Sequence, residues 1–394
     1  MTIRSCERAV FALLVLLSAF NAFAEPFEPA DSGYVVERLY SRRLPPALKE
    51  TRRLRQQLLK KPDDQELAAE VARNYLGLAH AEGDPRYAGY AQMALNPWWA
   101  VPNPPTAILH LRASIRQYNH DFKGAREDLD RALSTNRADI QAELTKAFVL
   151  QAQGDYAGAR ASCPAVGSAP SAALACLSSV DSFTGHAAQS DDRLSRAMPI
   201  YRTPEEKFWV LSILADIASR EGKPQLADQR FREALNLGVR DVLFLSLYSD
   251  FLLQQNRPDA VVALLKDETR VDMLLLRLAM AEKRLGLPAL KDHVAVLKAR
   301  FIANRLRGDI RNSREEARFT LDLLEDAPTA LAFSKTNWEI QKEPEDLTVL
   351  YQAAVATGDA AAIATVKEWL GRTKLEDAYL KSLITRNEKA VKRP

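Results

Sequence analysis

The chain has 394 residues, of which 47% are hydrophobic and 27% charged, and its formal net charge is only +3. A net charge so close to zero excludes the strongly basic surface that is typical of a nucleic-acid-binding protein. It also excludes a strongly acidic tail that would keep the chain soluble. The length allows two or three ordinary domains or one long array of repeats. Glycine is scarce, with 15 residues, and alternating runs rich in Val, Ile and aromatic residues are hard to find. This composition predicts an all-α fold.

Residues 1–24 have the pattern of an export signal. Arg4 and Arg8 form a positive n-region, 9–20 is an apolar run, and Ala22-Phe23-Ala24 supplies a small-x-small cleavage site. The apolar run is too short to span a bilayer comfortably, and no later segment approaches about 18 apolar residues. No cysteine follows the cleavage site, as a lipid anchor would require. The sequence therefore predicts a cleaved signal peptide over 1–24 and a soluble protein exported, most simply, into a periplasm.

Cleavage would remove Cys6 and leave two cysteines, Cys163 and Cys176. In an oxidising compartment, an even pair of cysteines close in sequence is a disulfide candidate. The segment 164–170 between them is turn-like, so the two sulfur atoms can meet. Closing a loop of this size stabilises a fold by roughly 3 kcal/mol in the chain-entropy treatment. We therefore predict a structural disulfide between Cys163 and Cys176.

The mature chain begins with a lead-in and one helix, which together occupy 25–62. From 63 onward, apolar residues recur at steps of three and four, in paired segments separated by short turns. The predicted pairs up to 268 are 65–95, 108–133, 147–163, 174–198, 211–235 and 245–265. In 269–394 the period is looser, and the predicted elements are the pairs 273–307, 314–341 and 344–370 and a charged terminal helix at 376–389.

The turns are the clearest sign of a repeat. Positions 120, 154, 185, 222 and 256 hold His, Gly, Gly, Gly and Asn, at separations of 34, 31, 37 and 34. All three residue types tolerate the positive φ that a left-handed helix C-cap requires. The second helices keep the same register. Their small residues, five positions after the turn, are Ala125, Ala159, Ala227 and Val261, and the larger residues four positions further on are Leu129, Phe231 and Leu265.

A 34-residue helix–turn–helix with these small and large positions resembles the tetratricopeptide repeat. The pair 211–235 matches best, with Leu211, Leu214, Ala215 and Ala218 in the first helix and Ala227, Phe231 and Ala234 in the second. The first-helix aromatic residues of the family are mostly aliphatic here, and Arg137, Arg202 or Val239 replaces its closing proline. The resemblance is best over 105–268. It implies a right-handed α-solenoid of roughly nine helix–turn–helix pairs, and it says almost nothing about chemistry.

Signals of catalysis are missing from the sequence. The five histidines form no i, i+3 or i, i+4 pair, and there is no Gly-rich phosphate loop and no Gly-x-Ser-x-Gly elbow. We therefore expect no catalytic residue, no metal site, no cofactor and no enzymatic activity. Carboxylates mostly lie beside Lys or Arg, which is typical of solvated helix faces. Glu315 and Glu316, between Arg314 and Arg318, are an example.

Two adjacent tryptophans, Trp98 and Trp99, lie in the proline-rich connection 96–106. Adjacent residues of a helix cannot both face one core, so one ring could be exposed and anchor an interface. The alternative is that both rings pack at an irregular junction between the first and second repeats, and we favour this alternative.

The resemblance also implies a binding surface, because such arrays hold peptides or protein segments on their inner side. First-helix positions that do not pack between repeats line that side in the family. Transferred to this sequence, they are His110, Ser114, Gln117, Tyr118, Phe148, Gln151, Asp216, Arg220, Asp250 and Gln254. Aromatic, amide and charged side chains mixed in this way suit peptide recognition better than one strong anion.

The resulting hypothesis is a non-enzymatic periplasmic scaffold or adaptor that binds another envelope protein, or an extended peptide segment, on its concave face. The alternative is an accessory subunit of an envelope enzyme or of a transport or secretion machine, with a small peptide- or sugar-binding site near Trp98 and Trp99. Neither hypothesis involves nucleic acid or an integral membrane span, and the oligomeric state is left open.

Overall fold

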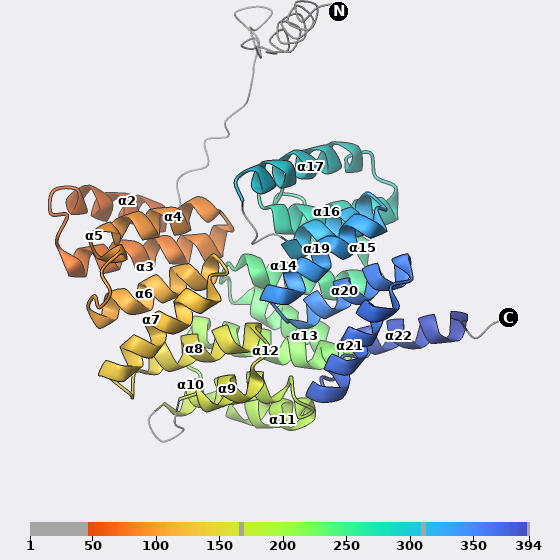
Figure 1. Ribbon diagram of the computed structural model, residues 1–394, viewed down its shortest axis with the longest axis horizontal. Coiled ribbons are helices and arrows are strands. Elements are labelled where there is room, and N and C mark those ends of the chain that lie inside the picture. The colour runs from red at the N-terminus through yellow and green to blue at the C-terminus, as the bar shows by residue number, and fades with distance from the viewer. Residues whose placement is uncertain (1–45, 165–168, 309–312, 392–394) are drawn as a thin grey trace, which may run out of the picture. The chain divides into compact units, whose positions relative to one another are not determined.

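The computed structural model describes residues 46–164, 169–308 and 313–391 (Figure 1). The predicted signal peptide and most of the predicted lead-in lie outside the described residues. All regular elements within the described ranges are helical, as predicted. None of these helices combines the length and the apolar character needed to cross a membrane.

Nine helix pairs follow one another within the described residues, so the predicted all-α solenoid of about nine pairs is confirmed. The first five pairs are α3 (Gln65–Glu82) with α4 (Pro85–Ala94), α6 (Thr106–Tyr118) with α7 (Phe122–Thr135), α8 (Ile140–Ala152) with α9 (Tyr156–Ala161), α10 (Pro170–Asp181) with α11 (Ala187–Ala197), and α12 (Pro204–Arg220) with α13 (Pro224–Asn236). The last four are α14 (Val242–Gln254) with α15 (Pro258–Leu265), α16 (Asp272–Leu285) with α17 (Leu290–Leu306), α18 (Ser313–Arg318) with α19 (Ala327–Ile340), and α20 (Pro344–Thr357) with α21 (Ala360–Thr373).

Four further elements of the described chain lie outside the nine pairs. They are α2 (Pro46–Leu58) before the first pair, α5 (Asn96–Trp99) in the connection to the second pair, a 3₁₀ turn at Met198–Ile200, and α22 (Ala378–Val391) after the ninth pair. A π-helical turn over Phe319–Leu323 continues α18.

The predicted turn residues all have the backbone conformation that the sequence required of them. The φ angles are 58° at His120, 76° at Gly154, 82° at Gly185, 73° at Gly222 and 54° at Asn256. The left-handed residue ends the first helix of each pair and lets the second helix return antiparallel to it. In the first, second, third, eighth and ninth pairs, an aspartate directly after this residue then caps the returning helix.

The predicted packing positions of the second helices are confirmed as well. Ala125, Ala159, Ala227 and Val261 have no exposed surface, and neither have Leu129, Phe231 and Leu265. The Phe231 ring lies 4.8 Å from the Tyr248 ring and 5.3 Å from the Phe251 ring, centroid to centroid. Phe231 therefore fills the space between its own pair and α14 of the next pair. Complete burial of a side chain of this size stabilises the folded state by about 1.5–3 kcal/mol.

The predicted disulfide is present between Cys163 and Cys176. It joins the chain just after α9 to the middle of α10, and the side chain of Cys176 is completely buried. The bridge thus fixes the third pair to the fourth, where α9 is only 6 residues long.

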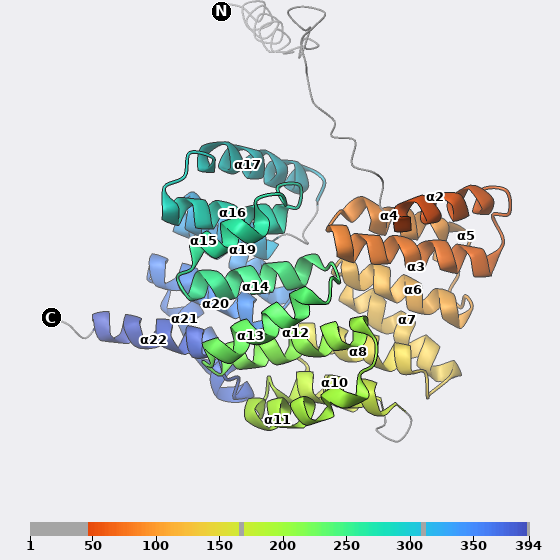
Figure 2. The same cartoon turned by 180° about the vertical axis from the view of Figure 1, so that it is seen from behind.

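The array turns back on itself, which the sequence pattern did not reveal. Helix α3 of the first pair contacts α14 of the sixth. The ninth pair and α22 return to the middle of the array, and Figures 1 and 2 show α20 to α22 on one side of α12 and α13. Two hydrogen bonds mark this return, from Lys342 N to Ala152 O at 2.8 Å and from Ala187 N to Glu376 Oε2 at 3.0 Å.

The returning C-terminal segment packs directly on the glycine turns of the third, fourth and fifth pairs. A Cβ atom on Gly154 would lie 2.3 Å from Cη2 of Trp369. On Gly185 or Gly222 it would lie 3.0 Å from the Cβ of Lys374 or of Ala378. These glycines are therefore needed for two reasons, a positive φ and the close approach of a distant part of the chain.

We predict that Gly154→Ala destabilises the protein by about 2 kcal/mol more than Gly358→Ala. Both residues have a positive φ, of 76° and 70°, so each alanine carries the left-handed strain of about 1–2 kcal/mol. Only at Gly154 does the new methyl group meet a packed ring, whereas Gly358 has nothing within 4 Å. Urea unfolding of the two variants measures the difference, and equal losses would mean that Trp369 does not rest on this turn.

Candidate functional site

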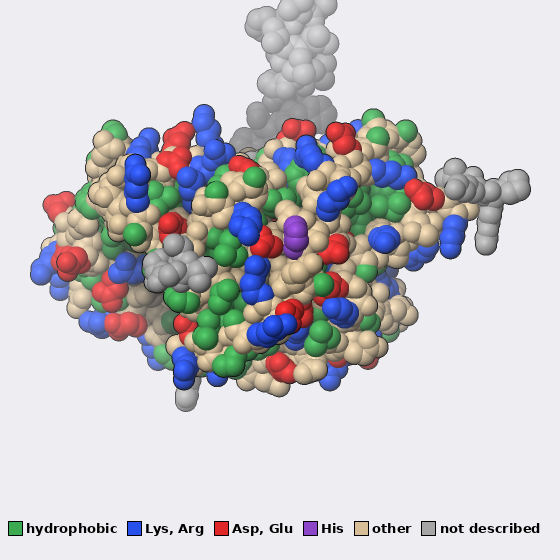
Figure 3. All heavy atoms as spheres, turned by 90° about the horizontal axis from the view of Figure 1, so that it is seen from below, with side chains coloured by type: hydrophobic (Ala, Val, Ile, Leu, Met, Phe, Trp, Pro, Cys, Tyr) green, Lys and Arg blue, Asp and Glu red, His purple; other side chains and the backbone are tan. Residues whose placement is uncertain are grey.

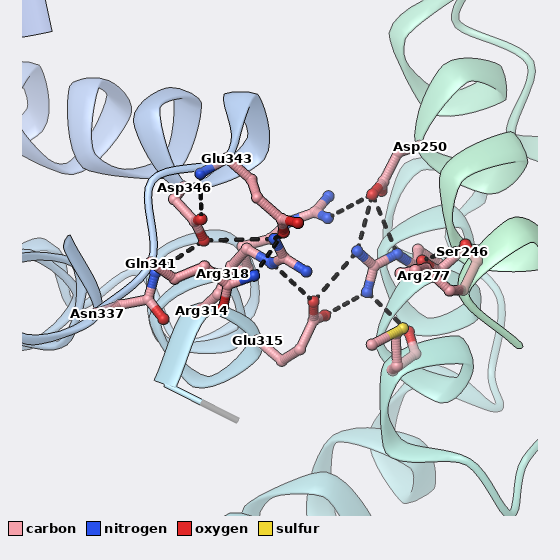
Figure 4. Close-up of polar contacts among 12 residues, drawn as sticks. Ser246, Asp250, Arg277, Arg314, Glu315, Arg318, Asn337, Gln341, Glu343 and Asp346 are labelled. Carbon is pink, nitrogen blue, oxygen red and sulfur yellow. Dashed lines mark hydrogen bonds and ion pairs between the residues drawn. The ribbon is translucent and has the colours of Figure 1, made fainter. Parts of the chain in front are cut away.

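The first helices of the sixth to ninth pairs converge on a network of buried charges (Figure 4). Arg277 of α16 lies at its centre, with only 1% of its side chain exposed. Its guanidinium donates to Asp250 Oδ2 of α14 at 2.8 Å and also binds both carboxylate oxygens of Glu315 of α18. Arg318 reaches the same Asp250 oxygen at 2.8 Å. One carboxylate therefore holds two arginines from different pairs.

The network continues through Arg314 to the ninth pair. Arg314 Nη1 lies 2.9 Å from Glu343 Oε2 and 3.3 Å from Asp346 Oδ1. Asn337 of α19 donates to the same Asp346 oxygen at 2.7 Å. Asp346 Oδ2 accepts from the backbone N–H of Glu343 at 2.8 Å and so also caps α20. A continuous chain of charge-assisted hydrogen bonds thus links α14 to α20.

The expectation that Arg314–Arg318 forms a solvated face is wrong. Glu315 is 3% exposed and Glu316 6% exposed. Arg314 lies beside Glu315, but the other ion pairs of this stretch join it to residues of other segments. These partners are 11 to 68 positions away in the sequence, so the local spacing of charges cannot reveal them. Only the place of these charges in the repeat could have indicated that they are buried. They lie at the start of a first helix, and first helices face the inside of the array.

The network shifts the pKa values of its members in opposite directions. Burial pushes the pKa of Asp250 upward, but Arg277 and Arg318 outweigh it and lower the pKa to about 2. Burial raises the pKa of Glu345; Arg314 opposes this rise, whereas Glu343 and Asp216 add to it. Asp250 is therefore held as a carboxylate, while Glu345 is a carboxyl group that is costly to ionise.

Beside the network lies a pocket of about 100 Å³, lined from α12, α14, α16, α18 with its π-helical turn, α20 and the start of α22. Four predicted partner-binding residues meet in its wall, namely Asp216, Arg220, Asp250 and Gln254. Sequence reasoning missed the contribution of the C-terminal segment to the same wall, for example Glu345, Asp377 and Tyr379.

Arg220 is already held by the protein inside this pocket. Only 5% of it is exposed, and it donates to Ser182 O at 3.0 Å and to Ser182 Oγ at 2.8 Å. It also pairs with Asp216 at 2.9 Å, and its guanidinium lies 4.5 Å from the centre of the Phe183 ring. Arg220 therefore joins the fourth pair to the fifth.

The other six inner-surface candidates lie on α6 and α8, outside the pocket, and all six are half-buried. Ser114 Oγ donates to His110 O at 2.9 Å, and His110 Nε2 lies 3.1 Å from Asp139 Oδ2. Burial lowers the pKa of His110, and Asp139 opposes that effect. Gln117 lies one residue before Tyr118 at the end of α6.

Aromatic contacts extend this second group of candidates to neighbouring pairs. The Tyr118 ring meets the His80 ring of α3 edge-on at 5.5 Å. The Phe148 ring meets the Trp209 ring of α12 edge-on at 6.3 Å, and Gln151 accepts a hydrogen bond from Ser179 at 3.3 Å. Phe148 and Trp209 come from the third and fifth pairs. Their contact therefore joins two first helices that are two pairs apart, α8 and α12.

Trp98 and Trp99 are both half-buried and pack against the core of the first pair. Arg112, which is 2% exposed, donates from Nη1 to the carbonyl oxygens of Trp98 at 3.2 Å and Trp99 at 2.8 Å. Its other nitrogens bind the fully buried Asp128. The connection is thus fixed by a buried ion pair that sequence reasoning did not find.

The face of the molecule seen in Figure 3 carries basic and acidic side chains interspersed, without a large area of one sign. Among the described residues, no three His, Cys, Asp or Glu side chains are grouped so that they could hold a metal ion.

No family model and no curated protein matches the chain. Similar solved structures include a tetratricopeptide repeat protein from Parabacteroides merdae, with 12% identity, a TM-score of 0.30, and coverage of 78% of this chain and 98% of that chain. The TPR domain of P58(IPK) has 12% identity and a TM-score of 0.24, with 88% and 98% covered. The structure of Naa15/Naa10 bound to HypK-THB has 14% identity and a TM-score of 0.24, with 87% and 63% covered. The assignment of this chain as an α-solenoid of tetratricopeptide-like pairs rests on its own helices and turns.

We predict that Arg277→Met destabilises the protein by about 3–5 kcal/mol, because it leaves Asp250 and Glu315 buried with one cation fewer. The control is Arg196→Met, which removes an i, i+4 pair whose arginine side chain is 78% exposed and which is worth at most about 1 kcal/mol. Chemical denaturation of both variants tests this. If Arg277→Met lowered the free energy of unfolding as little as Arg196→Met does, the network would be solvated.

We also predict that Glu345→Gln becomes increasingly stabilising, relative to the native chain, as the pH rises above 4.5. Burial raises the pKa of Glu345 in the folded state above this ordinary value, so the contribution of Glu345 to stability is complete below pH 4.5. It is lost as the pH rises from 4.5, where the unfolded chain begins to ionise, through the higher pKa of the folded state.

Glu206→Gln is the control with the opposite sign. Hydrogen bonds from the backbone N–H groups of Thr203 and Arg202 lower the pKa of Glu206, so its contribution is present above pH 4.5 and lost below. Unfolding free energies of the native chain and both variants, measured from about pH 3 to pH 9, give the two trends, that of Glu206 below pH 4.5 and that of Glu345 above it. A Glu345→Gln difference that shrinks with pH would contradict the assignment.

Proposed function

We propose that this chain is a non-enzymatic periplasmic scaffold or adaptor that holds a protein partner, or an extended segment of one, along the inner side of its solenoid. The observation that carries the proposal is the half-buried group of aromatic and amide side chains on α6, α8 and α12. Tyr118, Phe148, Gln151 and Trp209 belong to it.

The chemistry of this group suits a peptide. Aromatic rings with one side packed and one side accessible supply apolar area that is already ordered, so little conformational entropy is lost on binding. An amide such as that of Gln117 can both donate to and accept from a peptide backbone. Interface energy in protein complexes is concentrated in such aromatic anchors.

The position of the C-terminal segment limits where the partner would lie. Around the sixth to ninth pairs, the inner side is occupied by the charge network, and Arg277 and Glu315 are almost completely buried there. The proposed contact surface is therefore confined to the second to fifth pairs, a length that suits a short extended segment.

The periplasmic part of the proposal comes from the signal-like sequence of 1–24, with Arg4 and Arg8 before the apolar run. The disulfide between Cys163 and Cys176 supports it, since structural disulfides persist mainly in oxidising compartments. Trp98 and Trp99 are packed against protein, so we do not extend the proposal to a small-ligand site beside them.

A photoreactive residue placed at Tyr118 or Phe148 should trap a discrete protein partner when the cells are irradiated. Matched controls are Arg126 on α7 and Glu233 on α13, exposed residues of second helices. Mass spectrometry of the crosslinked species identifies the partner. Crosslinking from the two control positions alone would refute binding on the inner side.

A further inference from the structure

The pocket beside the charge network carries more negative than positive groups. Its acidic residues are Asp216, Asp250, Asp322, Glu345 and Asp377, and its basic residues are Arg220, Arg284 and Arg318. The three arginines all have partners within the protein. Arg220 binds Asp216 and Ser182, Arg318 binds Asp250, and Arg284 donates to the carbonyl oxygen of Leu253.

Within the described residues, three carboxyl groups of the pocket form no close ion pair with an arginine or lysine, namely those of Asp322, Glu345 and Asp377. Cations act on them only from a longer distance, Arg318 and Arg284 on Asp322, Arg314 on Glu345, and Arg220 on Asp377. Asp377 accepts hydrogen bonds from backbone N–H groups, among them that of Leu380 at 2.8 Å. Burial raises the pKa of each of the three, so each would gain from a cation brought close to it.

A buried oxygen atom in the pocket wall also lacks a partner. Asp250 is 6% exposed, and its Oδ2 binds both Arg277 and Arg318. Its Oδ1 is buried with no hydrogen bond. An unsatisfied oxygen of a buried carboxylate costs free energy, and a donor placed in the pocket would recover part of it.

The remaining wall determines which kind of cation fits. Leu247, Phe251, Met280 and Val349 supply an apolar side to the pocket. The described carboxylates nowhere gather in the group of three that a metal ion would need. A cation with an alkyl chain meets both conditions, because its methylene groups can lie on the apolar side while its N–H donors reach carboxylates that are spread apart.

We propose that this pocket binds an alkylammonium group, carried either by a free diamine or by the lysine side chain of a partner segment. The ammonium group donates to Glu345, Asp322 or Asp377, and the pocket of about 100 Å³ admits one such group and excludes a folded partner. The inference goes beyond the proposed function, since a free diamine would occupy the pocket without any protein partner.

Isothermal titration calorimetry of the full chain with 1,4-diaminobutane and with Nα-acetyl-lysine amide tests the proposal. The neutral 1,4-butanediol and the anionic succinate have similar carbon chains and serve as controls. We expect at least one amine to bind and both controls to fail. Binding of the diamine alone identifies a free amine as the occupant, and binding of the lysine derivative alone identifies a protein side chain. Failure of both amines, or equal binding of the diol, would overturn the proposal.

Glu345→Gln and Asp322→Asn should each weaken amine binding about tenfold, since each removes a carboxyl group that ionises beside the bound ammonium group and accepts its hydrogen bond. Glu127→Gln, an exposed carboxylate on α7, should change the affinity less than about twofold. Unchanged affinity in both pocket variants would place the amine elsewhere. Loss of binding through unfolding is excluded by recording the unfolding midpoint of each variant.

Amine binding that persists while crosslinking at Tyr118 and Phe148 fails would retain this inference and refute the proposed function alone.

Discussion

The structure of the C-terminal half depends on one constraint, which is that Arg277 cannot be buried without its two carboxylate partners. A guanidinium taken out of water loses several kcal/mol of solvation, and only close, well-aligned anions compensate for this. Asp250 and Glu315 meet the requirement from α14 and α18, so the sixth, seventh and eighth pairs must keep one relative register. Apolar stripes alone would allow neighbouring pairs to slide with little loss. A network of this kind need not add stability, but it penalises every arrangement that breaks it.

The same constraint explains why the array turns back on itself. Arg314 extends the network to Glu343 and Asp346 at the start of α20, and this holds the ninth pair near the middle of the array. The C-terminal segment then rests on the turns of earlier pairs, where Gly154 and Gly185 leave space for Trp369 and Lys374. The turn residues that adopt a positive φ thus also form the surface on which the C-terminal segment packs.

The inner side of the array is consequently divided into two parts with different chemistry. Around the second to fifth pairs it presents half-buried rings and amides such as Phe148 and Gln151. Around the fifth to ninth pairs it closes into a small pocket with an excess of carboxyl groups. The proposed peptide segment would lie on the first part, and the proposed ammonium group in the second. The two parts are joined by α12, which carries both Trp209 and the pocket residue Asp216.

The sequence by itself determined the local architecture. The spacing of His120, Gly154, Gly185, Gly222 and Asn256 gave the turns, and the positions of Ala227 and Phe231 gave the packing, because both depend on short-range geometry that recurs every 34 residues or so. It also brought Asp216, Arg220, Asp250 and Gln254 to one surface through the register of the repeat.

Only the tertiary structure decided which charges are buried. Glu315 and Arg318 look like a solvated pair in sequence, and their main partners are supplied by helices tens of residues away. The identity of a buried ion's partner depends on how the pairs stack and return, which no local pattern encodes.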